Sequence, residues 1–569
     1  MIIQQRSISN QDHTLQGYSP LIQRLLLARG VTSSEEMEFS LSKLLPPTGM
    51  KGIEQAASLL ADAVVQKKRI LIVGDFDADG ATSTALSVRC LRTFGAEHVG
   101  YLVPNRFEYG YGLSPEIVRE ASKYQPDVIM TVDNGISSIE GVTEANRLGI
   151  QVLVTDHHLA GDELPDAAAI VNPNQPDCSF ESKALAGVGV AFYTMLALRK
   201  RLREMDWFVS QQIPEPNMAV FLDLVAVGTV SDLVPLDSNN RILVAMGLER
   251  IRAGKACAGI YALLNVAKRL PKNLTSTDIG FAIGPRINAA GRLDDMSEGI
   301  ECLLCDDPQK ALQLAAHLDS LNRERKDIET GMRMEAEQFV ESMAGQQGIP
   351  KGVVVHQANW HEGVIGIVAS RIKERFYRPV IAFADADNGI KGSARSIPGL
   401  HMRDCLDLVS KRNPGLILKF GGHAMAAGLT IKTDGIEEFT AAFNHVLDEH
   451  FDHVDYEQTL FTDGELNRSE LSLSVAEQLN MCFPWGQRFP EPVFEGVFDV
   501  HFVRVLNGGH IKWTFVLEGG ELIDAIYFNV KTPEDFQAAS KLKLCYRLSV
   551  NEFRDSRTLQ LMIDFAEVV

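Results

Sequence analysis

The hydrophobic positions in the first half of the chain form short, uninterrupted apolar runs separated by stretches with helical periodicity. The runs cover 69–73, 98–103, 127–132, 150–154 and 168–171, and helices are expected between them, for example over 81–94 and 138–148. Apolar runs of this length are typical of strands that are buried on both faces. Strands that alternate with helices predict a parallel α/β sheet, which we place in a domain spanning 51–305.

The pattern changes in the remainder of the chain. Residues 1–50 read as an N-terminal helical lead, with a helical stretch at 21–31 before the Pro46-Pro47 pair. Residues 306–348 are rich in helix formers and predict one long connecting helix. A smaller α/β companion segment follows over 349–452. From 453 to 569, short runs of alternating polarity predict a small β-barrel.

Composition narrows the class of protein. With 569 residues, 45% hydrophobic and 23% charged, the chain has ordinary globular composition. It has neither a transmembrane run nor the apolar core of a signal peptide, so we expect no membrane association. Eight scattered cysteines indicate a reduced, cytoplasmic protein, and the single CxxC at Cys302 and Cys305 is expected to be buried rather than to bind zinc. The net charge of −19 means that any nucleic-acid contact needs a local basic groove.

The stretch "ILIVGDFDADG" at 70–80 places three aspartates at alternate positions after a predicted strand. Such a pattern also opens an EF-hand calcium loop. An EF-hand requires a glutamate at loop position twelve and a helix in front of the loop. Counting from Asp75, position twelve is Leu86, and the preceding residues read as a strand. The EF-hand is therefore excluded.

Acidic residues and histidines follow three of the predicted strands. Because the carboxyl ends of parallel strands meet at one edge of a sheet, these side chains are expected to converge. Carboxylates with an imidazole suit Mn²⁺ or Mg²⁺, and two such ions about 3.5–4 Å apart can hydrolyse phosphate esters. A single aspartate at a strand end is usually a cap, but the ordered combination favours metal binding. The candidates are Asp75, Asp77, Asp79, Asp133, Asp156, His157 and His158, with Asp232 after an apolar helix.

Several motifs carry a family resemblance. "GDFDADG", "TVDNG", "TDHH" and "GTVSD" resemble, in order and spacing, the motifs of the DHH phosphoesterase superfamily. "VPNRFEYGYGL", "GPRINAAGRLDDM", "WHEGVIGIVASRI" and "FGGHAMAAGL" narrow the resemblance to the RecJ family of bacterial single-strand-specific exonucleases. The resemblance implies a catalytic DHH domain, a long connecting helix, a smaller companion domain with a GGH motif, and a C-terminal OB-fold.

The resemblance also implies site roles. It gives Asp133 as the carboxylate shared by two ions, His158 as a residue that faces the phosphate or supports the ligands, and His423 as a group facing the scissile phosphate. Many relatives carry a histidine where this chain has Val73. We expect Asp75 to replace that ligand, with a turn cap as the alternative. The implied metal ligands are Asp77, Asp79, Asp133, His157 and Asp232, and the implied catalytic groups are Asp133, His157, His158 and His423.

Candidate phosphate contacts lie within the same motifs. Guanidinium groups match phosphate oxygens two at a time, and glycine-rich turns allow a ligand to approach. The basic run 199–203 is instead expected to be a solvated helix face. In the barrel, Lys512, Trp513, Arg554 and Arg557 could serve either DNA or the barrel itself. The candidate DNA contacts are Arg106, Arg286, Asn288, Arg292, Arg371, Arg395, Ser396 and His423.

The resemblance implies a monomeric, Mn²⁺- or Mg²⁺-dependent exonuclease. It would degrade single-stranded DNA in the 5′ to 3′ direction to 5′-mononucleotides during repair and recombination, with a single-strand-binding protein and a helicase as partners. Two alternatives are a phosphoesterase of short oligonucleotides or small phosphate substrates and an inactive DNA-binding relative. The barrel argues against the former, because a small substrate needs no strand-binding module. The clustered acids argue against the latter, because unpaired carboxylates repel one another without a metal.

Overall fold

The computed structural model describes residues 1–8, 15–105, 111–386, 389–553 and 556–569. The chain divides into two compact units. The larger unit comprises Gln4–Asp319 with Phe461–Val569, and the smaller comprises Met1–Ile3 with Ser320–Leu460. Within the described ranges, no helix has the length and apolar character needed to cross a membrane.

The core of the larger unit is a five-stranded parallel sheet in the order β3-β2-β4-β5-β6. All five predicted strands are confirmed: β2 (Arg69–Gly74), β3 (His98–Leu102), β4 (Val128–Val132), β5 (Gln151–Thr155) and β6 (Ala169–Val171). From β2 the chain moves to β3 on one side and then returns to β4 on the other. Ligand sites in open α/β sheets form where the strand order reverses in this way. That point lies at the carboxyl ends of β2 and β4.

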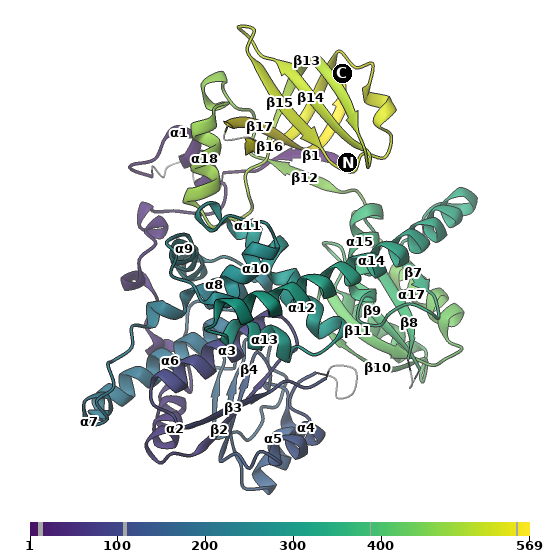
Figure 1. Ribbon diagram of the computed structural model, residues 1–569. Helices are drawn as coiled ribbons and strands as arrows, with labels where there is room; N and C mark the ends of the chain where they lie inside the picture. Colours follow the sequence, from purple (N-terminus) through teal and green to yellow (C-terminus); the bar gives the residue numbers. More distant parts are fainter. Residues whose placement is uncertain (9–14, 106–110, 387–388, 554–555) are drawn as a thin grey trace. The chain divides into compact units, whose positions relative to one another are not determined.

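Helices cover both faces of this sheet. Leu71 and Val73 of β2 point to the face that packs against α4 and α5. On the opposite face lie α3 and α6, which pack against each other (Figure 1). The predicted helices at 81–94 and 138–148 are confirmed as α3 and α5. The helices of this region are α1 (Pro20–Leu27), α2 (Ile53–Val65), α3 (Ala78–Thr93), α4 (Pro115–Ser122), α5 (Ile139–Arg147) and α6 (Gly187–Glu204).

A helical layer follows the sheet in sequence, as expected. It includes a π-helix, Ile279–Ile283, which the sequence analysis did not predict. Of the CxxC pair that was expected to be buried, Cys302 is fully buried in this layer, whereas Cys305 is only half-buried. The helices are α7 (Trp207–Ser210), α8 (Leu222–Ser231), α9 (Ser238–Arg252), α10 (Ala258–Val266), α11 (Ser276–Asp278), α12 (Gly284–Leu293) and α13 (Ser297–Leu304).

The C-terminal part of the larger unit is a closed barrel in the order β13-β14-β15-β17-β16, preceded by α18 (Leu473–Cys482). Along β14, Ile511, Trp513 and Phe515 are buried and alternate with more exposed residues. Trp513 is therefore a core residue rather than a base-stacking one. The strands are β13 (Phe494–Leu506), β14 (His510–Val516), β15 (Leu522–Tyr527), β16 (Lys541–Phe553) and β17 (Ser556–Val568).

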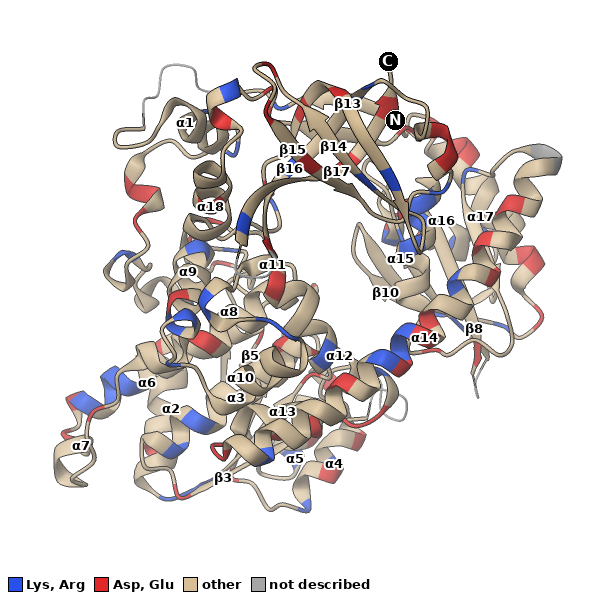
Figure 2. Ribbon diagram, turned by 45° about the horizontal axis from the view of Figure 1, so that its top comes forward, with Lys and Arg blue, Asp and Glu red and all other residues tan. Residues whose placement is uncertain are grey.

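The predicted connecting helix is α14 (Pro308–Gln347), which begins in the larger unit and continues into the smaller one. Acidic and basic residues alternate along it (Figure 2). The smaller unit has a mixed sheet in the order β10-β11-β9-β8-β7, with Phe383, Phe439 and Phe443 in its core. Its elements are β7 (Val353–His356), α15 (Ile365–Phe376), β8 (Val380–Ala386), β9 (Gly389–Arg395), α16 (Met402–Arg412), β10 (Ile417–Gly422), β11 (Ala426–Ile431) and α17 (Ile436–His450); β1 (Ile2–Gln5) pairs with β12 (Thr459–Thr462).

Candidate metal centre

The loop between β2 and α3 is held by hydrogen bonds within the loop and by one to Asn288 of α12. Asp77 is the N-cap of α3, and its Oδ1 accepts the N–H groups of Asp79 at 2.9 Å and Gly80 at 3.0 Å. The N–H of Ala78 donates to Asn288 Oδ1 at 2.7 Å. Asp77 therefore caps the helix, and Asp75 is buried beside it. Asn288, expected to contact DNA, supports the loop.

Asp79 is buried against the start of α6. Its carboxylate accepts the N–H groups of Gly187 at 2.6 Å and Val188 at 2.9 Å. These are the first N–H groups of α6, where the helix dipole also favours a negative charge. Burial and the neighbouring charge of Asp77 nevertheless raise the pKa of Asp79 to about 7. A cation at this carboxylate would counter both effects.

Asp133 follows β4 in a left-handed conformation, with φ of 63°. The approach of α6 to this residue requires a glycine, because a Cβ on Gly187 would lie 2.6 Å from Asp133 Cβ. Burial and the charges of Asp79 and Asp77 raise the pKa of Asp133 well above its usual range. Among the described residues, none donates a hydrogen bond to the buried Oδ1 of Asp133.

His157 and Asp232 complete the cluster. His157 Nε2 lies 3.1 Å from Asp133 Oδ1 and 3.5 Å from Asp232 Oδ2. Burial and the neighbouring aspartates also raise the pKa of Asp232. Buried carboxylates repel one another, and carboxylates beside an imidazole are ligands that suit a divalent cation, so this cluster fits such an ion.

Ligand atoms gather in groups whose members lie within 4.8 Å of one another. One group is Asp79, His157 and Asp232, and another is Asp75, Asp77 and Asp133. His157 and Asp133 connect the two groups through the 3.1 Å approach of their atoms. Two neighbouring groups of oxygen and nitrogen ligand atoms can hold two ions, as in the two-ion centre expected from the sequence.

Asp156, a candidate from the TDHH motif, and Tyr111, which was not among the candidates, support the histidine pair. Asp156 is fully buried and accepts from the backbone N–H of His157 at 2.7 Å and from that of Ile136 at 2.9 Å. Its Oδ1 also lies 2.8 Å from His158 Nδ1. Burial lowers the pKa of His158, but the bond to Asp156 and its charge outweigh burial and raise it. The hydroxyl of Tyr111 donates to the carbonyl of Asp133 at 3.1 Å and lies 3.0 Å from His158 Nδ1.

The candidate phosphate contacts of the larger unit differ in their surroundings. Arg286 Nε donates to Asp319 at 2.9 Å, and its Nη1 donates to the carbonyl of Ala282 at 2.6 Å. Arg292 is half-buried in the last turn of α12. Arg106 lies outside the described residues. A phosphate contact by Arg286 would have to share the guanidinium with Asp319.

In the smaller unit, Arg371 pairs with Glu329 and Glu374. Arg395 Nε donates to Ser370 at 3.1 Å, and its Nη1 donates to Ser393 at 3.1 Å. Because serine hydroxyls are uncharged, these hydrogen bonds orient the guanidinium group of Arg395 without neutralising its charge.

Two further candidates of the smaller unit lie near the β10–β11 hairpin. Ser396 is fully buried and donates to the carbonyl of Leu400 at 2.7 Å, so its hydroxyl serves the fold. His423 is exposed in the turn that joins β10 to β11.

The barrel candidates form ion pairs with acidic neighbours. Lys512 pairs with Asp524 at 2.7 Å. Arg557 pairs with Glu477 at 2.8 Å and with Glu552 at 2.9 Å. Arg554 lies outside the described residues.

Three family models match the chain. The DHH family, N-terminal domain, matches residues 69–229, the DHHA1 domain matches 350–449, and the RecJ OB domain matches 462–564. These matches cover the parallel-sheet domain, the smaller α/β unit and the barrel.

Curated relatives match over nearly the whole chain. The single-stranded-DNA-specific exonuclease RecJ of Dickeya dadantii is 54% identical, over 96% of this chain and 95% of that protein. The protein of the same name from Escherichia coli is 52% identical over 96% and 95%, and that from Bacillus subtilis is 34% identical over 99% and 69%.

Solved structures agree with the sequence matches. The crystal structure of RecJ in complex with Mn²⁺ from Thermus thermophilus has a TM-score of 0.79 at 30% identity, covering 96% of this chain and 76% of that one. The corresponding Mg²⁺ complex has a TM-score of 0.74 at 29% identity, covering 96% and 74%.

Proposed function

The chain belongs to the RecJ family of single-stranded-DNA-specific exonucleases, and from this premise we propose that it degrades single-stranded DNA from the 5′ end to 5′-mononucleotides in repair and recombination. The observation that carries the proposal is the convergence of buried carboxylates and His157 at the ends of β2, β4 and β5. The closed barrel adds a module suited to a strand rather than to a small substrate.

Two Mn²⁺ or Mg²⁺ ions are proposed for this centre. Asp79, His157 and Asp232 would hold one, Asp75 and Asp77 would hold the other, and Asp133 would lie between them. Bound ions supply an activated water and stabilise negative charge on the phosphate and leaving oxygen. The assignment of Asp75 as a ligand is supported by its place in the second group, with Asp77 and Asp133.

The chain's own groups would orient the phosphate. Asp156 fixes the ring of His158 and favours its protonated form, so His158 can donate to a phosphate oxygen. Tyr111 holds the backbone at Asp133 and contacts the same ring. Asp79 and the N-terminus of α6 fix the opposite wall of the centre.

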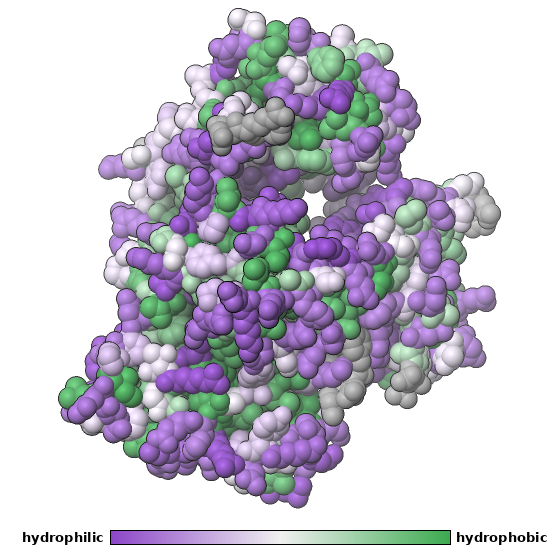
Figure 3. Space-filling view, viewed as in Figure 1, coloured by the Kyte–Doolittle hydropathy of each residue, from purple (hydrophilic) through white to green (hydrophobic). Residues whose placement is uncertain are grey.

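Further contacts to DNA are proposed for the smaller unit and the barrel. Arg395 is oriented by Ser370 and Ser393 and is proposed to bind phosphate, together with Arg371 and the exposed His423. Figure 3 shows apolar residues among polar ones on the barrel surface. Apolar side chains exposed on its strands can pack against bases: Val497, Phe502, Val505 and Leu522.

We propose further that the protein acts as a monomer in the cytoplasm. A helicase would supply the single strand, and a single-strand-binding protein would cover it. Because the larger unit by itself supplies both described ligand groups, the proposed centre needs no residue from a second copy. The bacterial sources of the relatives support a cytoplasmic location, because bacterial chromosomal DNA lies there.

The test uses one oligonucleotide in three forms with Mn²⁺: a single strand labelled at the 5′ end, the same strand labelled at the 3′ end, and a blunt duplex. We expect the 5′ label to appear at once in mononucleotides, whereas the 3′ label shortens gradually and the duplex persists. Early mononucleotides from the 3′ label, or equal degradation of the duplex, would contradict the proposal.

A further inference from the structure

We propose that the turn Trp485–Phe489, together with Leu233 and Phe281, forms a single-strand-binding surface beside the metal centre. Arg488 at the tip of the turn binds a backbone phosphate, and Phe281 and Leu233 pack against a base. This inference rests on the proposed function, because it takes DNA as the substrate of that centre. It adds a binding site outside the acidic cluster, the smaller unit and the barrel strands.

The turn is fixed against the segment that follows α8. The carbonyl of Gln487 accepts the N–H of Leu236 at 2.9 Å, and the carbonyl of Trp485 accepts the hydroxyl of Ser276 at 2.6 Å. The rings of Trp485 and Phe489 stack with their centroids 5.1 Å apart. These contacts hold the tip of the turn in a defined place, next to the segment that begins at the candidate ligand Asp232.

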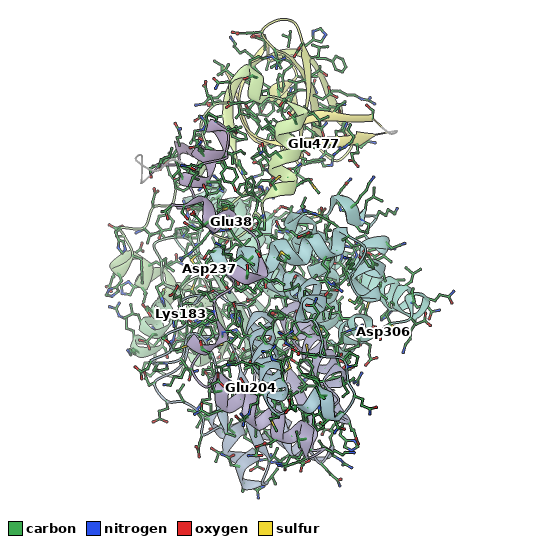
Figure 4. The ribbon with its side chains drawn as sticks, turned by 90° about the vertical axis from the view of Figure 1, so that its left-hand side faces the viewer. Glu38, Lys183, Glu204, Asp237, Asp306 and Glu477 are labelled. Atoms are coloured by element: carbon green, nitrogen blue, oxygen red, sulfur yellow. The ribbon has the colours of Figure 1, made fainter. Side chains whose placement is uncertain are left out.

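On one side of the turn lies a cavity of about 580 Å³ that His157 and Arg488 both line. Its size is within the range of about 300–1,000 Å³ that is common for ligand pockets. Because the candidate ligand His157 forms part of the wall, the cavity borders the metal centre. Lys183 and Asp237, two other wall residues, are labelled in Figure 4. The remaining wall residues are Arg29, Ala184, Leu185, Val234, Pro235, Leu236 and Arg241.

The charge of this cavity is positive after its ion pairs are counted. Arg29 pairs with Asp463 at 2.8 Å and Arg241 pairs with Glu36 at 3.2 Å, so these two guanidinium groups are neutralised.

Two other cations keep their charge. Lys183 donates to the carbonyls of Pro173 and Cys178, both at 2.7 Å, and carbonyl groups do not cancel a charge. Arg488 is exposed, and within the described part of the chain it has neither an ion pair nor a side-chain hydrogen bond. One acid, Asp237, faces these cations and accepts from Ser182 at 2.6 Å. Two positive charges against one negative charge favour the binding of an anion, such as a phosphate diester, in this cavity.

Arg488 occupies a backbone conformation that arginine rarely adopts, with φ of 57°. Glycine or asparagine would fit such a position with less strain. Strain of this kind is common at binding sites, where the side chain has a use that offsets it. Here the guanidinium is presented to solvent beside the cavity, which is the position from which it could bind a passing strand.

On the other side of the turn, two large apolar side chains are exposed. Leu233 is 69% exposed with φ of 59°, and Phe281 of the π-helix is 75% exposed. With Gly486 and Gln487 they border a shallow apolar cavity of about 120 Å³. Aromatic and apolar surfaces next to a basic groove are the common means of binding single strands without sequence preference. Because the same turn borders the cavity at His157, the occupant is a nucleotide strand rather than a protein.

The first test removes the charge of Arg488 without adding backbone strain. Arg488→Asn is compared with Arg201→Asn, which removes an exposed arginine from the basic end of α6 (Figure 2). Binding of a fluorescent 20-nucleotide single strand is measured by anisotropy in EDTA at several salt concentrations. We expect Arg488→Asn to raise Kd about tenfold and to reduce the salt slope by about 0.7, with an unchanged or higher Tm. A Kd and slope equal to those of Arg201→Asn would overturn the phosphate contact.

The second test addresses the base contact. Phe281→Ala is compared with Phe339→Ala, which removes another exposed phenylalanine, on α14. We expect Phe281→Ala to raise Kd about tenfold for the normal strand, as base–aromatic stacking predicts, and to have little effect on a strand of abasic nucleotides. An equal loss on both strands, or no loss on either, would overturn the stacking contact.

The binding tests and the proposed function can fail separately. Binding is measured without metal, so it does not depend on hydrolysis. If the strand binds and the two variants weaken binding but Mn²⁺ gives no cleavage, the surface stands and the proposed function fails. If wild-type protein cleaves the strand and neither variant changes binding, the function stands and the surface is overturned.

Discussion

Asp75 is the aspartate that we expect to supply a metal ligand in place of a histidine, because this chain has Val73 two residues earlier. Its carboxylate lies in the group with Asp77 and Asp133, and the helix is capped by Asp77. Asp75→Asn should therefore raise the Mn²⁺ concentration for half-maximal activity by about tenfold, and saturating metal should restore part of the rate. The measurement is a Mn²⁺ titration of nuclease activity. A titration that overlays the wild type would show that Asp75 is not a ligand.

Gly187 is the closest neighbour of the proposed bridging ligand on the α6 side. A Cβ there would lie 2.7 Å from Asp133 Oδ1. Gly187→Ala should displace this carboxylate, lower kcat by about a hundredfold and reduce stability by about 1–3 kcal/mol. Gly189→Ala on the same helix is the control, because its Cβ would meet only the side chain of Leu185, at 3.0 Å. Equal activity of the two variants would show that the approach of α6 has no part in placing Asp133.

At this scale, candidate ligands are easier to predict from the sequence than the residues that hold those candidates in place. Asp77, Asp79, Asp133, His157 and Asp232 could be selected because each belongs to a motif, and the first four follow strands whose ends must meet.

Gly187 lies in none of these motifs, and Tyr111 lies in the motif VPNRFEYGYGL, where nothing indicates that its hydroxyl contacts Asp133. Their importance depends on which helix and loop pack against Asp133, and that is fixed by tertiary contacts. The ion pair of Arg286 could not be predicted either, because its partner Asp319 lies 33 residues further along the chain.

Among the elements, α14 is the longest helix described, with 40 residues, and it contains a glycine near its middle. A Cβ at Gly331 would meet no atom within 4 Å. Gly331→Ala should therefore stabilise the helix by about 0.5–1 kcal/mol, because glycine loses more backbone entropy on folding. Hydrogen exchange of peptides from α14 measures this directly. Faster exchange in the variant would contradict the assignment of Gly331 to an ordinary, unstrained helical position.

Most helices and strands could be predicted because the spacing of their hydrophobic residues is typical of one type of element. The five strands of the parallel sheet lie within one residue of the predicted runs at each end, and the alternating segments near the C-terminus form the barrel that was predicted. The π-helix Ile279–Ile283 could not be predicted, since its hydrogen-bond spacing leaves no distinct periodicity in five residues. The turn Trp485–Phe489 could not be predicted either, because its conformation depends on hydrogen bonds with Leu236 and Ser276, which lie in a distant part of the chain.

For the whole molecule, the metal centre should contribute to stability. In the absence of metal, buried carboxylates at Asp79, Asp133 and Asp232 repel one another, and bound cations would remove that repulsion. Mn²⁺ at about 100 times its Kd should stabilise the folded protein by about 2.7 kcal/mol, seen as a rise in Tm that EDTA reverses. Hydrogen exchange should place the added protection in the larger unit. Protection confined to the smaller unit would contradict the proposed location of the ions.

The measurement that tests the central claim most directly is mononucleotide release from a 5′-labelled single strand at saturating Mn²⁺ by Asp133→Ala. The control is Asp162→Ala, which removes an exposed aspartate from the same domain. Loss of the carboxylate shared by both ions should lower kcat by about a thousandfold while the fold is retained, whereas the control should match the wild type. Turnover by Asp133→Ala near the wild-type rate would contradict a two-metal centre built around Asp133.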